Sequence, residues 1–265
     1  MTQTELAATF RALHDDLLVL PNCWDAASAR IIQQAGAPAL ATSSAAVAWS
    51  LGTRDGNVLD RNLMLEHLRR IIAVSSVPVS CDIEGGFGDS AADLAETTRL
   101  VIEAGAVGVN LEDAFDRGLR PVEEAAARVR VVRDAADAAG IDLYLNARTD
   151  GYLLGAADFD DTVARAAAYL EAGASGIFVP GVTDLETVSR LTAAIDAPVN
   201  ILTGPSAPPI AQLKAAGARR VSAGSSLAAA VFGHVERAAR ELLDEGTYTG
   251  LEGAHTWAEL NALFE

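Results

Sequence analysis

The stretch "IEAGAVGVNLED", residues 102–113, contains the pattern that decides the fold. It combines the end of a helix, a turn with glycine where helices stop, and a short apolar strand that ends on two acids. Three further stretches repeat this order: "QQAGAPALAT" at 33–42, "LEAGASGIFVPG" at 170–181 and "LKAAGARRVSAG" at 213–224. Four helices that each turn directly into a buried strand indicate alternating βα units.

Four more apolar stretches between these repeats are expected to form strands. They are "LLVLPN" at 17–22, "VPVSCDIE" at 77–84, "DLYLNARTD" at 142–150 and "APVNILTG" at 197–204. The strands are apolar throughout, as in parallel sheets that are covered on both faces, and alanine-rich helical segments follow them. Eight such units predict an α/β fold, a (β/α)8 barrel of the TIM type. A doubly wound open sheet is the alternative, although it usually has fewer strands.

The chain has no linker and no break in composition, so residues 1–265 are expected to form one barrel domain. The segment "LAAAVFGHVERAARELLDEG" at 227–246 has helical periodicity but completes no βα unit. Residues 227–265 are therefore expected to form a C-terminal helical extension. Leu227, Val231, Val235 and Leu242 share one apolar face, and we expect this extra helix to pack on a neighbouring subunit.

The chain carries 20 lysines and arginines against 36 acids, a formal net charge of −16. Such a surface repels phosphate backbones and anionic membranes, which argues against nucleic acid or a membrane as partner. The N-terminus is not a signal peptide, and no apolar run reaches the roughly 18 residues of a membrane span. Cys23 and Cys81 lie in apolar surroundings and are expected to be buried thiols. We therefore expect a cytoplasmic protein.

Polar side chains gather at the carboxyl ends of the predicted strands, where the active sites of such barrels lie. "CDIEGGFGD" at 81–89 places Asp82 and Glu84 two residues apart, on one side of a strand, and Glu112 ends the next strand. Three carboxylates at one mouth repel one another unless a cation neutralises them, and Mg²⁺ (or Mn²⁺) suits such a site. The alternative is that these acids cap helices or form surface ion pairs. The other polar residues at strand ends are Asp113, Asn146, Arg148, Asp150, Asn200 and Thr203.

Five motifs in order resemble the isocitrate lyase / phosphoenolpyruvate mutase superfamily over about residues 17–246. They are "PNCWDAASARI", "SLGTRDGN", "CDIEGGFGD", "GVNLEDA" and "LNARTD". The resemblance implies a Mg²⁺-dependent (β/α)8 barrel that cleaves or makes C–C or P–C bonds next to a 2-oxo acid, usually through an enolpyruvate-like intermediate. It also implies a homodimer or homotetramer in which a C-terminal helix packs on the neighbouring barrel.

The resemblance assigns metal and catalytic roles to individual residues. Asp82 matches the direct metal ligand, and Glu84 and Glu112 match acids that reach the metal, often through water. Asp55 matches an active-site carboxylate beside metal and substrate. With Arg148, which matches the arginine that holds the charged end of the substrate, Asp55 and Glu112 are the expected catalytic residues.

The substrate itself is expected to lie against a second set of residues. Ser43, Ser44 and Ala45 match a small-residue loop that holds the substrate carboxylate through hydroxyl and N–H groups. Asn200 and Thr203, on the seventh strand, are candidates either for binding a distal carboxylate or for buried polar capping.

The sequence departs from the superfamily after the fourth strand. Lyases carry a mobile gating loop there with the pattern Lys-Lys-Cys-Gly-His, and mutases carry an Asn that holds the phosphoryl group. This chain has "EDAFDRGLRPVEEAAAR" at 112–128, which offers only Asp116, Arg117 and Arg120. A true isocitrate or methylisocitrate lyase and a true phosphonomutase are therefore both disfavoured.

Three hypotheses follow from these features. The leading one is a Mg²⁺-dependent lyase that breaks a C–C bond in a small 2-oxo or 2-hydroxy di- or tricarboxylate. The second is P–C bond chemistry on phosphonopyruvate, which "LGTRDGN" favours and the missing loop Asn opposes. The third is a catalytically weak barrel that binds 2-oxo acids without turning them over.

Overall fold

The repeated helix–glycine–strand pattern is present in the computed structural model, which describes residues 1–116 and 118–265. Gly36, Gly105, Gly173 and Gly217 follow helices in the left-handed region, with φ between 95° and 105°. Side chains with a Cβ rarely adopt this conformation, so glycine ends each helix and lets the chain turn into the next strand.

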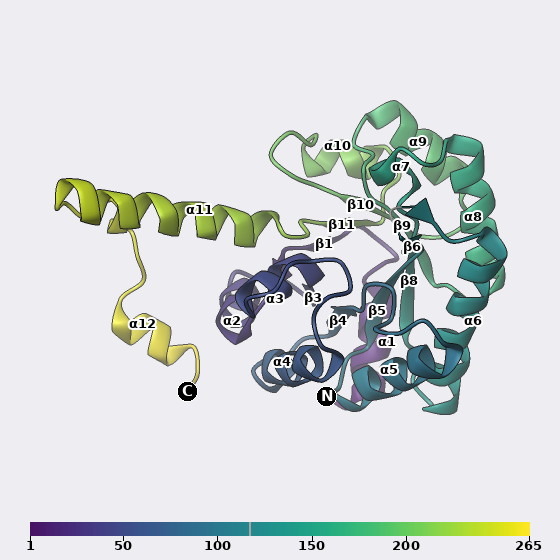
Figure 1. The fold of residues 1–265 in the computed structure, drawn as a ribbon, viewed down its shortest axis with the longest axis horizontal. Helices are drawn as coiled ribbons and strands as arrows, with labels where there is room; N and C mark the ends of the chain where they lie inside the picture. Colours follow the sequence, from purple (N-terminus) through teal and green to yellow (C-terminus); the bar gives the residue numbers. More distant parts are fainter. Residues whose placement is uncertain (117) are drawn as a thin grey trace.

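Nine strand segments form one parallel sheet in the order β1-β11-β10-β9-β8-β5-β4-β3-β2 (Figure 1). The two end segments, β1 and β2, belong to one run of chain that Pro21, which has no N–H to donate, interrupts. Because β1 pairs with β11 and β2 pairs with β3, the sheet closes at this run into a barrel of eight strands among the described residues. The segments are β1 Leu18–Leu20, β2 Asn22–Cys23, β3 Leu40–Thr42, β4 Val79–Asp82, β5 Gly108–Glu112, β8 Tyr144–Arg148, β9 Gly176–Val179, β10 Val199–Leu202 and β11 Arg220–Ser222.

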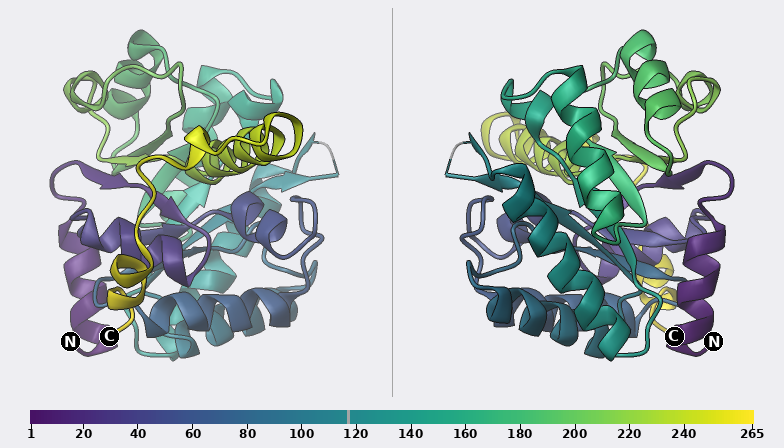
Figure 2. Two further views of the ribbon diagram at one scale, coloured as in Figure 1. Left: turned by 90° about the vertical axis from the view of Figure 1, so that its left-hand side faces the viewer. Right: turned by 90° about the vertical axis from the view of Figure 1, so that its right-hand side faces the viewer.

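The predicted barrel is confirmed, and each strand ends within two residues of the expected position. Helices surround the sheet on the outside (Figure 2), and a short antiparallel hairpin, β6 Ala114–Phe115 with β7 Gly118–Leu119, follows β5. The helices of the barrel are α1 Gln3–Ala12, α2 Ala26–Gln34, α3 Ser44–Ser50, α4 Arg61–Ala73, α5 Ala91–Glu103, α6 Val122–Ala138, α7 Gly151–Leu154, α8 Phe159–Glu171, α9 Leu185–Ala194 and α10 Ile210–Ala215.

Two buried apolar clusters show which side chains face into the barrel. The larger cluster, which includes Val109, Leu145 and Ile177, lies between the strands and the outer helices. The smaller one lies inside the barrel, where Phe10 of α1 packs against Tyr144. Because side chains alternate along a strand, residues of the same parity as Tyr144, such as Asn146 and Arg148, face the interior. Both cysteines are buried free thiols, as expected.

The C-terminal extension is helical, as predicted. Helix α11 (Ser226–Arg240) runs directly into a π-helical turn, Glu241–Glu245, and projects away from the barrel (Figure 1). A 3-10 turn (Thr249–Leu251) and α12 (Trp257–Ala262) follow, and Arg30 of α2 donates a hydrogen bond to the Leu263 carbonyl. Among the described residues, no helix is both long and apolar enough to cross a membrane. Packing of α11 on a neighbouring subunit stays a prediction.

Candidate active site

The acids and the arginine predicted at strand ends lie side by side at one end of the barrel. Strands β4, β5 and β8 are neighbours, and Glu112 and Arg148 are direct cross-strand partners. The Glu112 N–H donates to the Glu84 carbonyl at 3.1 Å, so the chain after β4 stays beside the end of β5. The parallel register therefore brings Asp82, Glu84, Glu112 and Arg148 to the same mouth.

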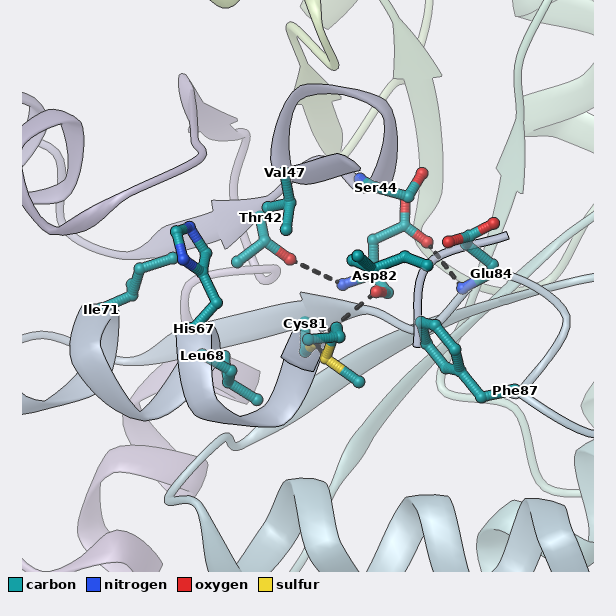
Figure 3. Close-up of a pocket in the computed structure, with 12 residues that line it drawn as sticks. Thr42, Ser44, Val47, His67, Leu68, Ile71, Cys81, Asp82, Glu84 and Phe87 are labelled. Carbon is teal, nitrogen blue, oxygen red and sulfur yellow. Dashed lines mark hydrogen bonds between the residues drawn. The ribbon is translucent and has the colours of Figure 1, made fainter. Parts of the chain in front are cut away.

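Asp82 ends β4 and is held by backbone donors on both sides (Figure 3). Its Oδ1 accepts from the Glu84 N–H at 3.1 Å, and its Oδ2 accepts from the Ser44 N–H at 3.4 Å. Its own N–H donates to the Thr42 hydroxyl at 2.9 Å. Asp82 is thus fixed between the β4 end and the start of α3. Behind it lies a small cavity of about 10 Å³, roughly the space of one water, lined mainly by apolar side chains.

Glu84 is buried and has a φ of 48°, a left-handed conformation that side chains with a Cβ rarely adopt. Its carboxylate accepts from the Asn57 N–H, and the Gly85 N–H donates back to the Asn57 Oδ1 at 3.0 Å. This pair of contacts fastens the loop that carries Asp55 to the end of β4. Burial raises the pKa of Glu84 to about 7, and the charges of Asp82 and Asp55 add to the rise although the Asn57 N–H opposes it.

Asp55 lies on the exposed part of that loop, with its carboxyl group turned towards the other acids. Partial burial of the carboxyl group raises its pKa, and the negative charge of Asp82 raises it further. The Ser44 hydroxyl and the more distant Arg148 act in the opposite direction. Asp55, Asp82 and Glu84 therefore form one group of mutually repelling carboxylates.

Arg148 is the cation of the mouth and is paired on two sides. Its Nη1 lies 3.0 Å from Glu112 Oε2, and its Nε donates to Asp150 Oδ1 at 2.6 Å. Burial nevertheless raises the pKa of Glu112 to about 8, in spite of the opposing charge of Arg148. When both are ionised, Glu112 and Asp150 together carry more negative charge than one guanidinium balances.

The candidate ligands are chemically suited to a divalent cation, but each of these carboxylates already makes other contacts in the structure. In the described part of the chain, no three His, Cys, Asp or Glu side chains are arranged to hold a metal ion as they stand. Asp82 and Glu84 are bound to backbone N–H groups, and Glu112 is paired with Arg148. All candidate ligands are carboxylate oxygens, which suit Mg²⁺. Burial raises the pKa values of Glu84 and Asp55, and repulsion between the acids raises them further. An ionised carboxylate has about four acceptor sites, so Asp82 and Glu84 can keep these backbone donors and still bind a cation.

The predicted substrate loop lies beside this group. Ser43 is buried at the N-terminus of α3 and its side chain makes no capping hydrogen bond, while Ser44 and Ala45 are half-buried in the first turn. The Ser44 N–H that contacts Asp82 places this loop next to the acids. A cleft of about 710 Å³ opens on the other side of the Glu84 turn, between Asn57, Phe87 and the β6–β7 hairpin.

Asn200 and Thr203 are not brought to the acids. Asn200 is buried inside the barrel, where its amide donates to the Ser222 hydroxyl at 3.2 Å. The Thr203 hydroxyl donates to the Ser222 carbonyl at 3.3 Å. Both contacts are with Ser222 of β11, and the binding of a distal substrate carboxylate by Asn200 and Thr203 stays a prediction.

The hairpin after β5 places its charged residues away from the acid group. Arg120 is buried, stacks on the Phe115 ring at 4.0 Å and pairs with Glu124 and Asp89. Asp116 is exposed and has a φ of 45°. Arg117, the remaining charged residue expected in this segment, lies outside the described residues.

Sequence reasoning missed Asn57, and it missed the contact that fixes Asp113. Asn57 stands in the quoted motif "SLGTRDGN", and the Asp-Gly-Asn order predicts a tight turn with left-handed residues. That signal could have marked Asn57, whose φ is 59°. Asp113 is buried and accepts a hydrogen bond from Tyr169, which lies 56 residues further along the chain. No local pattern marks this second contact.

Comparisons with known proteins agree with this geometry. Residues 10–243 match the family model of phosphoenolpyruvate phosphomutase. The 2-methylisocitrate lyase of Escherichia coli strain K12 is 35% identical over 181 residues, which are 64% of this chain and 60% of that enzyme. A crystal structure of a candidate lyase/mutase from Burkholderia cenocepacia J2315 is 41% identical, with a TM-score of 0.93 over 99% of this chain and 96% of the other. The structure of 2,3-dimethylmalate lyase, a PEP mutase/isocitrate lyase superfamily member, is 25% identical, with a TM-score of 0.88 over 99% and 95% of the two chains.

Proposed function

This chain belongs to the phosphoenolpyruvate phosphomutase family, within the isocitrate lyase/PEP mutase superfamily of lyases and mutases, and we propose that it is a Mg²⁺-dependent carbon–carbon lyase. The proposed substrate is a small 2-oxo or 2-hydroxy di- or tricarboxylate, cleaved through an enolpyruvate-like intermediate. Support comes from 2-methylisocitrate lyase and 2,3-dimethylmalate lyase, the named relatives that match the chain.

One observation carries the proposal: an excess of carboxylates at the mouth beside a single paired arginine. Burial raises the pKa values of Asp55 and Glu84, and the negative charge of Asp82 raises both further. A site built only to stabilise the fold would not place acids together without a matching cation, because the repulsion costs free energy. Such a site is suited to a divalent cation and an anionic substrate.

Individual residues have distinct parts in this proposal. Asp82 and Glu84 would hold the cation directly or through water, with Glu112 nearby. When bound, Mg²⁺ would polarise the 2-oxo group and stabilise negative charge that develops on its oxygen. Arg148 would bind a substrate carboxylate through its planar guanidinium, and Asp55 would orient the reacting end of the substrate.

Anchoring of the other end of the substrate is proposed for the loop of Ser43, Ser44 and Ala45. Its Ser44 N–H lies 3.4 Å from Asp82, so a carboxylate on this loop would be adjacent to the proposed cation. Small side chains at this position leave space for the substrate and expose backbone N–H groups. In the lyase pattern of the superfamily, the segment after β5 supplies the general acid that protonates the departing fragment. This chain lacks that pattern in residues 112–128, so its general acid is not assigned to this segment.

P–C bond chemistry on phosphonopyruvate is the second candidate. The family model that matches residues 10–243 is that of phosphoenolpyruvate phosphomutase, which favours it. The segment after β5 lacks the Asn of the mutase pattern, which opposes it. The two candidates differ in the bond that breaks, so the products separate them.

The test is a product assay over four substrates, with Mg²⁺ and with EDTA. Oxaloacetate, 2-methylisocitrate, 2,3-dimethylmalate and phosphonopyruvate are supplied in turn, and pyruvate, oxalate, phosphate and phosphoenolpyruvate are measured. Metal-dependent release of an oxo acid or oxalate from one of the first three supports the lyase. Release of phosphate from phosphonopyruvate, or its conversion to phosphoenolpyruvate, supports the second candidate. A thermal shift with oxalate and Mg²⁺ but no turnover would leave a 2-oxo-acid-binding barrel.

We also propose that the protein is a homodimer or homotetramer in which residues 227–265 pack on a neighbouring barrel. Val231, Val235 and Leu243 of this extension are 44%, 58% and 85% exposed. Apolar side chains exposed on one projecting helix are expected to be covered in an assembly. A cytoplasmic location belongs to the same proposal, since both cysteines are free and buried.

A further inference from the structure

Asp113, the residue after Glu112, holds the turn that follows β8 at two points. It is 3% exposed. Its N–H donates to the Arg148 carbonyl at 3.1 Å, and its Oδ1 accepts from the Asp150 N–H at 2.9 Å. The backbone on both sides of Thr149 is therefore tied to a single residue at the end of β5.

Asp113 also influences the Arg148 side chain, because Asp150 contacts both residues. The Asp150 carboxylate accepts from Arg148 Nε at 2.6 Å, and its own position depends on the N–H that Asp113 holds. Asp150 is buried, and a buried carboxylate that is this close to a guanidinium restricts the rotation of the arginine. The contacts from Asp113 to Asp150 to Arg148 therefore set where the guanidinium points.

A third element, helix α8, fixes Asp113 from the outside of the barrel. The Tyr169 hydroxyl donates to Asp113 Oδ2 at 2.6 Å, and Arg165 Nη1 lies 3.4 Å from the same oxygen. Arg165 also donates to the Arg120 carbonyl at 2.9 Å, at the end of the hairpin that follows β5. Tyr169 is 1% exposed, so its hydroxyl group is packed in a rigid environment from which water is excluded.

We propose that Asp113, held by Tyr169, is a positioning residue that orients Arg148 for binding the carboxylate of the substrate. The inference rests on the proposed function, in which Arg148 binds that carboxylate. A planar guanidinium binds a carboxylate well only when its orientation is fixed, because two parallel hydrogen bonds must form together. Neither Asp113 nor Tyr169 needs to touch the substrate for this role.

Two buried tyrosines provide a matched test. Tyr169→Phe removes only the hydroxyl that holds Asp113. Tyr144→Phe removes a hydroxyl of similar burial on β8 which, among the described residues, has no hydrogen-bond partner. Calorimetry with Mg²⁺ alone, then with oxalate in the presence of Mg²⁺, separates metal binding from carboxylate binding. Tyr169→Phe is expected to weaken oxalate binding roughly tenfold with unchanged Mg²⁺ affinity, and Tyr144→Phe to change neither.

Crystal structures of the parent and of Tyr169→Phe make the test independent of the proposed function. The inference requires the Arg148 guanidinium to leave its contact with Asp150 in the variant. Retention of this contact, or parental oxalate affinity in Tyr169→Phe, would overturn the inference while the lyase proposal stands. If the parent itself binds no oxalate, the proposed function fails, and the position of Arg148 in the two structures still decides the inference.

Discussion

The carboxylates at the mouth differ in how far the protein itself neutralises them. Glu112 has Arg148 at 3.0 Å. Among the described residues, the close donors to Asp55, Asp82 and Glu84 are backbone N–H and hydroxyl groups. Backbone N–H groups orient a carboxylate but carry only partial charge. At the residue scale, Asp82 and Glu84 are therefore the acids whose function depends most on an added cation.

Asp82→Ala is predicted to abolish the dependence on divalent ions and to lower turnover by several orders of magnitude. Polarisation by a metal contributes several kcal/mol, and each ~1.4 kcal/mol corresponds to a factor of ten in rate. Calorimetric titration with Mn²⁺ or Mg²⁺ in the presence of oxalate measures the loss. Glu84→Ala and Glu112→Ala should weaken metal binding more mildly, since water can replace an outer ligand.

Arg148→Ala is the control for that series. It should leave the metal bound and raise the substrate concentration needed for half-maximal rate, because it removes a substrate contact rather than a ligand. Metal affinity in Asp82→Ala equal to that of the parent would show that Asp82 is not a ligand and only orders the start of α3.

His14 is predicted to make the fold sensitive to acid. Burial lowers its pKa from 6.5 to about 3, and the nearby charge of Arg220 adds to this. The unfolded chain then binds more protons between about pH 6.5 and 3, so the free energy of unfolding falls as the pH drops through this window. The loss at pH 5 is about 2 kcal/mol, from 1.5 pH units at 1.36 kcal/mol each.

Urea unfolding of the parent and of His14→Phe at pH 7 and pH 5 measures this effect. The variant should lose about 2 kcal/mol less than the parent between the two pH values, whatever its stability at pH 7. The same change with pH in both proteins would mean that other groups control the acid sensitivity.

At the scale of the element, α11 differs from every barrel helix because its apolar residues have little to pack against within the chain. Among the described residues of α11, Phe232 is the aromatic side chain that approaches aromatic rings of the barrel. Its ring centroid lies 6.4 Å from those of Trp24 and Trp49. Val231 and Val235, one turn apart, remain exposed. We expect a helix with these properties to gain stability from contacts with a neighbouring subunit.

Val231→Asp with Val235→Asp is predicted to reduce the oligomer to a monomer without unfolding the barrel. Burying two carboxylates in an apolar interface costs several kcal/mol, which exceeds what the remaining contacts supply. Light scattering at micromolar concentration reports the mass, and far-UV circular dichroism reports the fold. Ala229→Asp, on the opposite and exposed side of the helix, adds one negative charge away from the apolar face and should leave the mass unchanged. A parent that is itself monomeric would contradict the prediction.

At the scale of the whole molecule, one continuous apolar layer connects the βα units. It includes Cys23 at the start of the barrel, Leu111 in the middle and Val221 at the end. Because the run that contains β1 and β2 pairs with both β11 and β3, separating any group of strands from the barrel breaks backbone pairing along two edges. We expect the barrel to unfold cooperatively.

This prediction is tested by denaturant unfolding followed in two ways. Far-UV circular dichroism reports the helices and near-UV circular dichroism reports the aromatic side chains of the core. The two curves should have the same midpoint and slope at low protein concentration. Separate midpoints would show that part of the barrel unfolds independently.

The sequence alone determined the eight strands, their parallel order and the acids at their ends. These features follow from local rules: glycine after a helix turns the chain, an apolar run forms a buried strand, and alternation fixes the side to which Asp82 and Arg148 point. Glu84, expected on the same strand face as Asp82, lies instead in the turn after β4. Such rules act over a few residues, so they can be read from the sequence.

Only the tertiary structure decided which groups pair within the site. Arg148 pairs with Glu112 and Asp150, Glu84 binds the Asn57 N–H, and Tyr169 holds Asp113 from another helix. Alternation along a strand places a side chain inside the barrel, but it does not fix how deep the side chain lies or which group it contacts. Asn200, for example, faces inward and its amide donates a hydrogen bond to Ser222. A hydrogen bond depends on separations of tenths of an ångström between atoms far apart in the chain, and only the closed barrel sets those separations.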